Sequence, residues 1–175
     1  MTYDLRDKIL KYDRLVPRYT SYPTAPHFQP VDGEARYRQL LTSLPDNANL
    51  SLYLHVPFCS KMCWYCGCHT KITERYAPVE DYAHLMLREI DMIAHTISPS
   101  HQIQNIHFGG GSPGLLRACD FGKIMDRIKS KFHMGTSPEI AIEIDPRGVT
   151  ESRAAVYAAA GVNRISLGVQ DFDDK

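Results

Sequence analysis

Residues 50–68 read LSLYLHVPFCSKMCWYCGC, an apolar run with a proline near its end and four closely spaced cysteines after it. The apolar run, residues 50–57, is short and ends at the proline, which predicts a buried strand. The cysteines are Cys59, Cys63, Cys66 and Cys68, all within ten residues. A small secreted domain instead spreads its cysteines along the chain to form disulfides. This stretch therefore predicts a strand that leads directly into a metal-binding loop.

Three further strand-like runs follow, each separated from the last by a helical pattern. In these patterns apolar residues recur every three or four positions, as in helices that bury one face. The predicted strands are residues 50–57, 103–108, 139–144 and 162–169, and the predicted helices are residues 79–97, 121–132 and 150–161. Thr150 is suited to cap the third helix and Gly161 to end it. This alternation predicts parallel strands joined by crossover helices, an α/β fold.

Four strands are too few to close a barrel, and no helical pattern follows the fourth. We therefore expect a piece of a longer protein, with residues 1–49 as an N-terminal extension and residues 50–175 as an incomplete core. The extension includes residues 16–26, whose three prolines favour extended backbone. In parallel α/β folds, functional groups gather at the carboxyl ends of strands. Here those ends carry residues 59–68, 109–112, 143–147 and 170–171.

The overall composition argues against several other classes of protein. Lysine and arginine total 20 and are balanced by 20 acidic residues, so the chain lacks the positive charge typical of nucleic-acid-binding proteins. No apolar run reaches the roughly 20 residues that a membrane-spanning helix requires. The first residues mix acidic and basic side chains, unlike a secretory signal. We expect a soluble, cytoplasmic protein that binds neither nucleic acid nor membrane.

The cysteine spacing, C-x3-C-x2-C followed by Cys68, narrows the kind of metal site. Thiolates hold zinc or iron–sulfur clusters. A structural zinc site pairs two knuckles a dozen or more residues apart, whereas this loop is a single knuckle to which only His69 adds a ligand. Three cysteines can instead hold three irons of a [4Fe–4S] cluster and leave the fourth iron open. Cys68 is then either a fourth ligand or a neighbour of the cluster, and its closeness to Cys66 favours a neighbour. The fifth cysteine, Cys119, is expected to be buried in the second helix.

Several motifs together resemble the radical S-adenosylmethionine superfamily. These are the C-x3-C-x2-C spacing after the first strand, the aromatic Tyr65 before the third cysteine, and the glycine-rich residues 109–113 after the second strand. A longer match, from about Tyr12 to the end of the chain, resembles the oxygen-independent coproporphyrinogen III oxidases. That match rests on residues 17–26, 53–59, 66–68, 142–147 and 168–172.

The resemblance implies a fold, an activity and a set of cofactors. The fold is a partial (β/α) TIM-like radical SAM barrel, its first four strands preceded by the N-terminal extension. The activity is that of an oxidoreductase, a coproporphyrinogen dehydrogenase. A [4Fe–4S] cluster and S-adenosylmethionine, two molecules of it in the family, yield a 5′-deoxyadenosyl radical. That radical starts the decarboxylation of two propionates of coproporphyrinogen III to vinyl groups, which gives protoporphyrinogen IX. The implied protein is a monomer served by reduced flavodoxin or a ferredoxin-type electron donor.

The resemblance also implies roles for individual residues. The cluster ligands are Cys59, Cys63 and Cys66. The residues implied at the first S-adenosylmethionine are Tyr53, Tyr65, Gly110 and Glu143, and those at the second are Gly111, Ser112 and Gln170. At Gly110, the missing Cβ lets backbone polar groups approach the ligand. Two positions depart from the family pattern. Ser112 replaces a threonine and keeps its hydroxyl, and Gly114 stands where a polar residue is usual.

Structural interpretations remain open for several of these residues. Glu143 could form an ion pair with Arg147 or Arg164, Tyr53 could be packing, and His55 and His107 are typical of satisfied core histidines. Arg18 and Arg147 are candidate anchors for substrate carboxylates, with ion pairs as the alternative. Two other functions also remain. One is a haem chaperone of the same superfamily, a class that generally lacks counterparts of residues 17–26 and of the Cys66-Gly67-Cys68 motif. The other is an inactive fragment whose open sheet aggregates.

Overall fold

A computed structural model of the 175-residue chain describes residues 5–13, 23–30, 32–64 and 66–169. The chain divides into two compact units, Met1–Arg36 and Tyr37–Lys175. In the first unit the described helices are α1 (Leu5–Tyr12) and the 3-10 turn η1 (Ala25–His27), and α2 (Gly33–Thr42) crosses the division. Most of the proline-rich residues 16–26 lie outside the described residues. The expected boundary between residues 49 and 50 stays a prediction.

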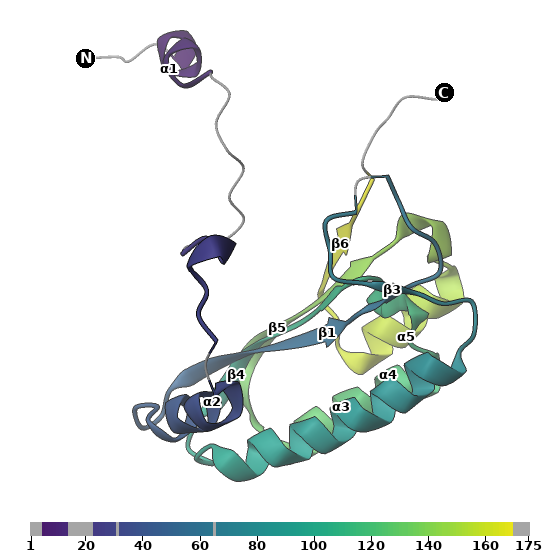
Figure 1. The fold of residues 1–175 in the computed structure, drawn as a ribbon. Coiled ribbons are helices and arrows are strands. Elements are labelled where there is room, and N and C mark those ends of the chain that lie inside the picture. The colour runs from purple at the N-terminus through teal and green to yellow at the C-terminus, as the bar shows by residue number, and fades with distance from the viewer. Residues whose placement is uncertain (1–4, 14–22, 31, 65, 170–175) are drawn as a thin grey trace. The chain divides into compact units, whose positions relative to one another are not determined.

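The second unit is built on a four-stranded parallel sheet, drawn in Figure 1. Its strands, in spatial order, are β1 (Asn49–Val56), β4 (Gln102–Gly110), β5 (His133–Ile144) and β6 (Arg164–Leu167). The helices are α3 (Ala77–Thr96), α4 (Ala118–Lys131) and α5 (Glu151–Ala160), with the 3-10 turns η2 (Pro113–Leu115) and η3 (Pro146–Gly148). A small parallel pair joins β2 (Phe58–Cys59) to β3 (Lys71–Ile72). The predicted α/β class, with parallel strands and crossover helices, is confirmed.

One face of the sheet forms the hydrophobic core with the three helices, which lie below it in Figure 1. Val56, Phe108 and Ile142 come from three neighbouring strands and are fully buried. Their helical counterparts include Phe121, whose ring centroid lies 4.9 Å from that of Phe108 and 5.2 Å from that of Tyr157. Full burial of one such side chain contributes about 1.5–3 kcal/mol. This apolar face fixes the register of the strands and therefore the placement of the opposite face.

The opposite face of the sheet is polar and carries the candidate site. Because side chains alternate along a strand, Ser51, Tyr53 and His55 of β1 point away from the helices. Cross-strand contacts link this face, with Asn105 Nδ2 3.1 Å from Ser51 Oγ and Arg164 Nε 3.0 Å from Glu139 Oε1. In the strand register Tyr53 lies opposite His107, and His55 lies opposite Gly109. Residues distant in sequence therefore become neighbours at the carboxyl ends of the strands.

Helix ends agree with the sequence pattern, whereas strand limits agree less well. Thr150 caps α5 by accepting a hydrogen bond from Arg153 N at 3.3 Å, and Gly161 ends that helix with φ of 96°. However, β5 begins at His133, before the predicted start, because its first residues pair with β4 ahead of a register shift. This stretch contains Gly135 and Pro138, and because glycine and proline are unfavourable within strands, the sequence pattern did not predict a strand there. Strand β6 is shorter than predicted.

The prediction that Cys119 is buried is wrong. Cys119 is exposed in the first turn of α4. The helix faces the core through Phe121, Ile124 and Ile128, and Cys119 falls outside that stripe. Its nearness in sequence to the apolar residues of the helix therefore did not place it on the buried face. Among the described residues, no helix combines the length and the apolar character needed to cross a membrane.

A buried polar network joins the start of α3 to the start of α4. The Tyr76 hydroxyl donates to Asp120 Oδ2 at 2.5 Å and accepts from Arg117 N at 3.0 Å, while the Arg117 guanidinium lies 3.8 Å from the Tyr76 ring centroid. Asp120 is 4% exposed. Burial acts to raise the pKa of Asp120, but hydrogen bonds from Tyr76 and Lys123 outweigh it and hold that pKa below its usual range. Burial, followed by the bond to Asp120, raises the pKa of Tyr76 to about 12.

Replacing Tyr76 with phenylalanine should lower the free energy of unfolding at neutral pH by about 1–3 kcal/mol, because a buried carboxylate loses a donor. The lowered Asp120 pKa stabilises the fold above the ordinary carboxyl pKa, and this stabilisation is lost as the pH falls through the lowered value. The wild-type chain should therefore lose stability below about pH 4, and Tyr76→Phe should lose less. Urea denaturation at neutral pH and at a pH below about 4 measures the free energy of unfolding of both chains. The control is Tyr37→Phe, which changes a half-exposed tyrosine. Equal acid sensitivity of Tyr76→Phe and wild type would contradict it.

Candidate cofactor site

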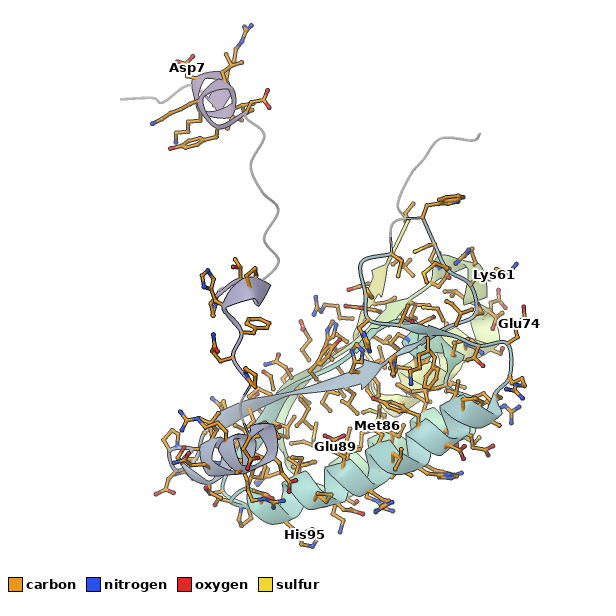
Figure 2. The ribbon with its side chains drawn as sticks, viewed as in Figure 1. Asp7, Lys61, Glu74, Met86, Glu89 and His95 are labelled. Atoms are coloured by element: carbon orange, nitrogen blue, oxygen red, sulfur yellow. The ribbon has the colours of Figure 1, made fainter. Side chains whose placement is uncertain are left out.

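The cysteine loop leaves the sheet just after β1 and returns beside its own starting point. At its base, Lys71 N donates to Pro57 O at 2.7 Å and Thr73 N donates to Cys59 O at 3.0 Å. Figure 2 shows Lys61 of the loop and Glu74, just beyond β3, at the same end of the fold. The paired strands β2 and β3 therefore hold both ends of the loop at the carboxyl end of β1.

The cysteines of the loop are all free thiols. Cys59 and Cys66 are half-buried, whereas Cys63 and Cys68 are exposed. Within the part of the chain that the structure describes, no three His, Cys, Asp or Glu side chains already converge in the geometry of a metal site. The thiols of the loop and Glu143 nevertheless interact electrostatically. Burial raises the pKa of the Cys68 thiol, and negative charge at Cys66, Glu143, Cys59 and Cys63 raises it further.

Cys59 is the most firmly held of the predicted ligands. The Thr70 hydroxyl lies within donating distance of Cys59 Sγ, at 3.4 Å, and of Pro57 O at the same distance. Gly111 packs directly against this pair, since a Cβ there would lie 2.7 Å from Thr70 Oγ1, 2.7 Å from Phe58 O and 3.0 Å from Cys59 Sγ. Thr70 was missed by the sequence analysis, because no spacing rule links a hydroxyl to a thiol eleven residues earlier.

The other two glycines contact different parts of the site. Gly110 has φ of +111°, and a Cβ there would lie 2.7 Å from the His55 ring. At Gly109, a Cβ would lie 2.9 Å from Tyr53 Cε2 and 3.2 Å from Glu143 Cδ. At both glycines a side chain of the protein itself occupies the space next to the missing Cβ. The predicted approach of a ligand at Gly110 stays a prediction. Three consecutive glycines let the end of β4 pack closely against residues of the neighbouring strands β1 and β5.

Tyr53, His55, His107 and Glu143 form a polar cluster on the open face of the sheet. The Tyr53 hydroxyl lies 3.1 Å from His55 Nδ1, and His107 Nε2 lies 3.0 Å from Glu143 Oε1. The Tyr53 and His107 rings stack with centroids 5.8 Å apart and planes at 19°. Burial raises the pKa of Tyr53, and the charges of Glu143 and Cys68 add to that rise. The cysteine loop and the polar cluster are therefore in electrostatic contact.

The arginines expected to pair with Glu143 have other partners. Arg147 forms a two-pronged ion pair with Asp145, with Nε 2.9 Å from Oδ1 and Nη2 2.5 Å from Oδ2. The Arg147 hydrogen bond holds the pKa of Asp145 below its usual range. Arg164 pairs with Glu139. The geometry thus favours the ion-pair interpretation of Arg147 over a free anchor, and it shows Glu143 bonded to His107 instead.

A groove of about 340 Å³ runs along β1 and α3 beside this cluster, and Tyr53 and His55 are among its lining residues. Met86 and Glu89 of α3, both labelled in Figure 2, also line it. The Tyr82 hydroxyl donates to His55 O at 2.8 Å and so ties α3 to the edge of β1. Tyr53 is 58% exposed. The polar cluster is therefore accessible to a small molecule.

The structure brings together most of the predicted site residues that it describes. At or next to the carboxyl ends of β1, β4 and β5 lie Cys59, Tyr53, Gly110, Gly111, Ser112 and Glu143. Cys63 and Cys66 lie farther along the loop that starts there, and among the described residues their thiols do not converge with that of Cys59 in the geometry of a metal site. The remaining candidates, Tyr65, Gln170 and Arg18, lie outside the described residues. Three thiols on one loop, with a hydroxyl and a glycine packed on the first of them, fit the ligand set of an iron–sulfur cluster.

A family model described as the radical SAM superfamily matches residues 53–175. The chain belongs to the radical SAM superfamily. The match includes the cysteine loop, the three glycines and Glu143, so the resemblance stated from the sequence is confirmed. Membership of this superfamily also accounts for the parallel α/β architecture. This chain forms the first part of the barrel.

The radical SAM chain is similar to several curated oxidases. It is 48% identical over 158 residues to the oxygen-independent coproporphyrinogen III oxidase of Bradyrhizobium diazoefficiens, covering 90% of this chain and 35% of that protein. It is 43% identical over 162 residues to the oxidase of that name from Paracoccus denitrificans, covering 93% of this chain and 36% of that protein. The solved structure of the Escherichia coli coproporphyrinogen III oxidase, described as a radical SAM enzyme, superposes with a TM-score of 0.82 at 34% identity, covering 98% of this chain and 37% of the other. The chain thus spans little more than a third of the length of these relatives.

Proposed function

We propose that this chain carries the cluster and S-adenosylmethionine site of an oxygen-independent coproporphyrinogen III oxidase. The observation that carries the proposal is the meeting of the cysteine loop, the three glycines and the Tyr53–His107–Glu143 cluster at one edge of the sheet. The relatives' names supply the reaction class.

In this proposal Cys59, Cys63 and Cys66 hold a [4Fe–4S] cluster, and Cys68 lies beside it without being a ligand. The cluster and S-adenosylmethionine together supply a radical that removes hydrogen from a substrate propionate. The chain's own residues bind and orient the cofactors. Thr70 directs its hydroxyl toward Cys59 Sγ, and hydrogen bonds to the sulfur ligands are one means by which proteins tune such clusters.

The proposed contacts with S-adenosylmethionine differ in kind between the two sets of residues. Tyr53 and Glu143 present a ring and a carboxylate on the accessible face, and with Tyr65 and Gly110 we assign them to the first molecule. Gly111 N donates to Val56 O at 2.8 Å, and Ser112 N donates to Phe58 O at 2.7 Å. Both amides are therefore already bonded, and the Ser112 carbonyl accepts from Leu115 N at 3.0 Å. The groups left at these positions for a second molecule are the Gly111 carbonyl and the Ser112 hydroxyl. Gln170 is the third residue assigned there.

The whole protein's reaction is proposed as the conversion of two propionates of coproporphyrinogen III to vinyl groups, which forms protoporphyrinogen IX. We assign it to the cytoplasm, as a monomer that receives electrons from reduced flavodoxin or a ferredoxin. The division into an extension at residues 1–49 and a core at residues 50–175 belongs to the same proposal. Most of the substrate-binding surface of such a protein is expected outside this chain, which spans about a third of the relatives.

Electron paramagnetic resonance on the anaerobically reconstituted, dithionite-reduced chain tests the cofactor site. We expect a [4Fe–4S]⁺ signal whose shape changes when S-adenosylmethionine is added, because an open iron accepts the cofactor. S-adenosylhomocysteine, which lacks the sulfonium charge, is the control ligand. A chain that holds no cluster, or a signal unaffected by the cofactor, would contradict the proposal. Stoichiometric haem binding with an unaffected signal would favour the haem-chaperone alternative.

A further inference from the structure

His107 contacts two of the residues proposed to bind S-adenosylmethionine. It lies on β4, between Tyr53 on β1 and Glu143 on β5. Its Nε2 is 3.0 Å from Glu143 Oε1, and its ring stacks on that of Tyr53 with a centroid distance of 5.8 Å. No other described side chain bonds the Glu143 carboxylate, so His107 alone among them restrains its orientation.

The direction of the hydrogen bond follows from the chemistry of the two groups. An ionised carboxylate only accepts hydrogen bonds, so the proton between the two atoms belongs to His107 Nε2. This bond occupies Oε1, and among the described residues no hydrogen bond reaches Oε2. Gly109 keeps this space open, because a Cβ there would lie 3.2 Å from Glu143 Cδ and 2.9 Å from Tyr53 Cε2. The carboxylate is thus held at one oxygen and left open at the other.

A purely stabilising role explains this arrangement poorly. The side chains of His107 and Glu143 are 29% and 44% exposed, and ion pairs this close to solvent contribute about 0–1 kcal/mol to stability. Holding a flexible glutamate in one orientation has a larger effect on ligand binding, because the ordering cost is met before the ligand arrives. The His107 ring also stacks on one face of the Tyr53 ring and restrains its orientation.

We infer that His107 is a positioning residue for S-adenosylmethionine, which fixes the Glu143 carboxylate so that Oε2 accepts a hydrogen bond from a hydroxyl or ammonium group of the cofactor. This inference rests on the proposed function, because it takes Glu143 to be a cofactor ligand. It assigns His107 a role other than that of a satisfied core histidine.

Two substitutions at position 107 separate the hydrogen bond from the bulk of the ring. His107→Gln keeps an N–H donor near the position of Nε2, whereas His107→Leu removes the donor and keeps apolar volume. We expect the dissociation constant of S-adenosylmethionine to rise about tenfold or more in His107→Leu, the effect of losing a hydrogen bond to a charged group. In His107→Gln it should stay within about threefold of wild type. Calorimetric titration of S-adenosylmethionine into the reconstituted chain measures this, with iron and sulfide content determined for each variant.

A double-mutant cycle with Glu143→Gln shows whether His107 acts through Glu143. If it does, His107→Leu has little further effect on S-adenosylmethionine affinity once Glu143 is replaced. Asn105→Ala is the matched control, because it removes another cross-strand hydrogen bond from the same face, 3.1 Å to Ser51. That variant should bind S-adenosylmethionine as wild type does.

Three results would overturn the inference. They are wild-type affinity in His107→Leu, equal losses in His107→Leu and His107→Gln, and fully additive losses with Glu143→Gln. The titration of the wild-type chain keeps these apart from a failure of the proposed function. If the wild-type chain with its cluster does not bind S-adenosylmethionine, the proposed function fails, and the inference fails with it. If the wild-type chain binds and the variants behave in one of the three ways above, only the inference fails.

Discussion

Replacing Cys63 with serine is expected to abolish the iron–sulfur cluster and leave the chain folded. Cys63 is exposed, and the base of its loop is held by backbone hydrogen bonds that do not use its side chain. Loss of one of three thiolates leaves too few soft ligands for a [4Fe–4S] cluster. We therefore expect iron and sulfide content, measured after anaerobic reconstitution, to fall to the level of a chain without cysteines. Circular dichroism should remain that of the wild-type chain.

Two further cysteines act as controls for this experiment. Cys119→Ser replaces another exposed thiol, on α4, and should retain the full cluster content. Cys68→Ser tests the expectation that Cys68 lies beside the cluster without being a ligand, and it should also retain the cluster. Wild-type iron content in Cys63→Ser would contradict the proposed ligand set. Loss of the cluster in Cys68→Ser would make Cys68 a ligand.

Replacing Gly110 with alanine should lower the free energy of unfolding by about 2–5 kcal/mol, combining backbone strain with overpacking. The backbone there has φ of +111°, which side chains rarely adopt, and the new Cβ would lie 2.7 Å from the His55 ring and 3.1 Å from Val56 N. The His55 ring can turn aside, but the Val56 amide belongs to β1 and cannot move without disturbing the sheet. Urea denaturation followed by circular dichroism measures the change.

Gly122 provides a matched control for Gly110→Ala. It lies within α4, and a Cβ there would meet nothing within 4 Å. Alanine is the better helix former, so Gly122→Ala should raise the free energy of unfolding by about 0.5–1 kcal/mol. The same substitution is therefore expected to have opposite signs at two positions. Unfolding of Gly110→Ala at the wild-type urea concentration would show that the end of β4 tolerates a side chain.

The three glycines illustrate how the fold brings the parts of the site into close contact. Gly109 leaves room for Tyr53 and Glu143, Gly110 for His55, and Gly111 for the Cys59 thiol and the Thr70 hydroxyl. Each missing Cβ lets a side chain from another element approach the end of β4. The segment thus links the loop that carries the thiols to the face that carries the carboxylate. A larger residue at any of the three would separate them.

The sequence could predict features that arise from local patterns. Short apolar runs identified the strands, and helical spacing identified the helices. Thr150 and Gly161 marked the ends of α5, because caps depend on nearby backbone. The four cysteines of the loop share one short segment, so their chemistry was also visible. The pairing of Arg147 with Asp145, two residues away, is also local, but the sequence analysis did not predict it.

Only the tertiary structure decided which distant side chains meet. His107 bonds Glu143 across 36 residues, and the sequence offered Arg147 and Arg164 as equally reasonable partners. The phase of α4 placed Cys119 in solvent, outside the stripe of Phe121, Ile124 and Ile128 that faces the core. Strand register determined these contacts, because it is set by packing of the whole apolar face and not by the polar residues themselves. The sequence alone therefore determined the type of fold and the thiol chemistry, and the folded sheet determined how the carboxylate beside it is held.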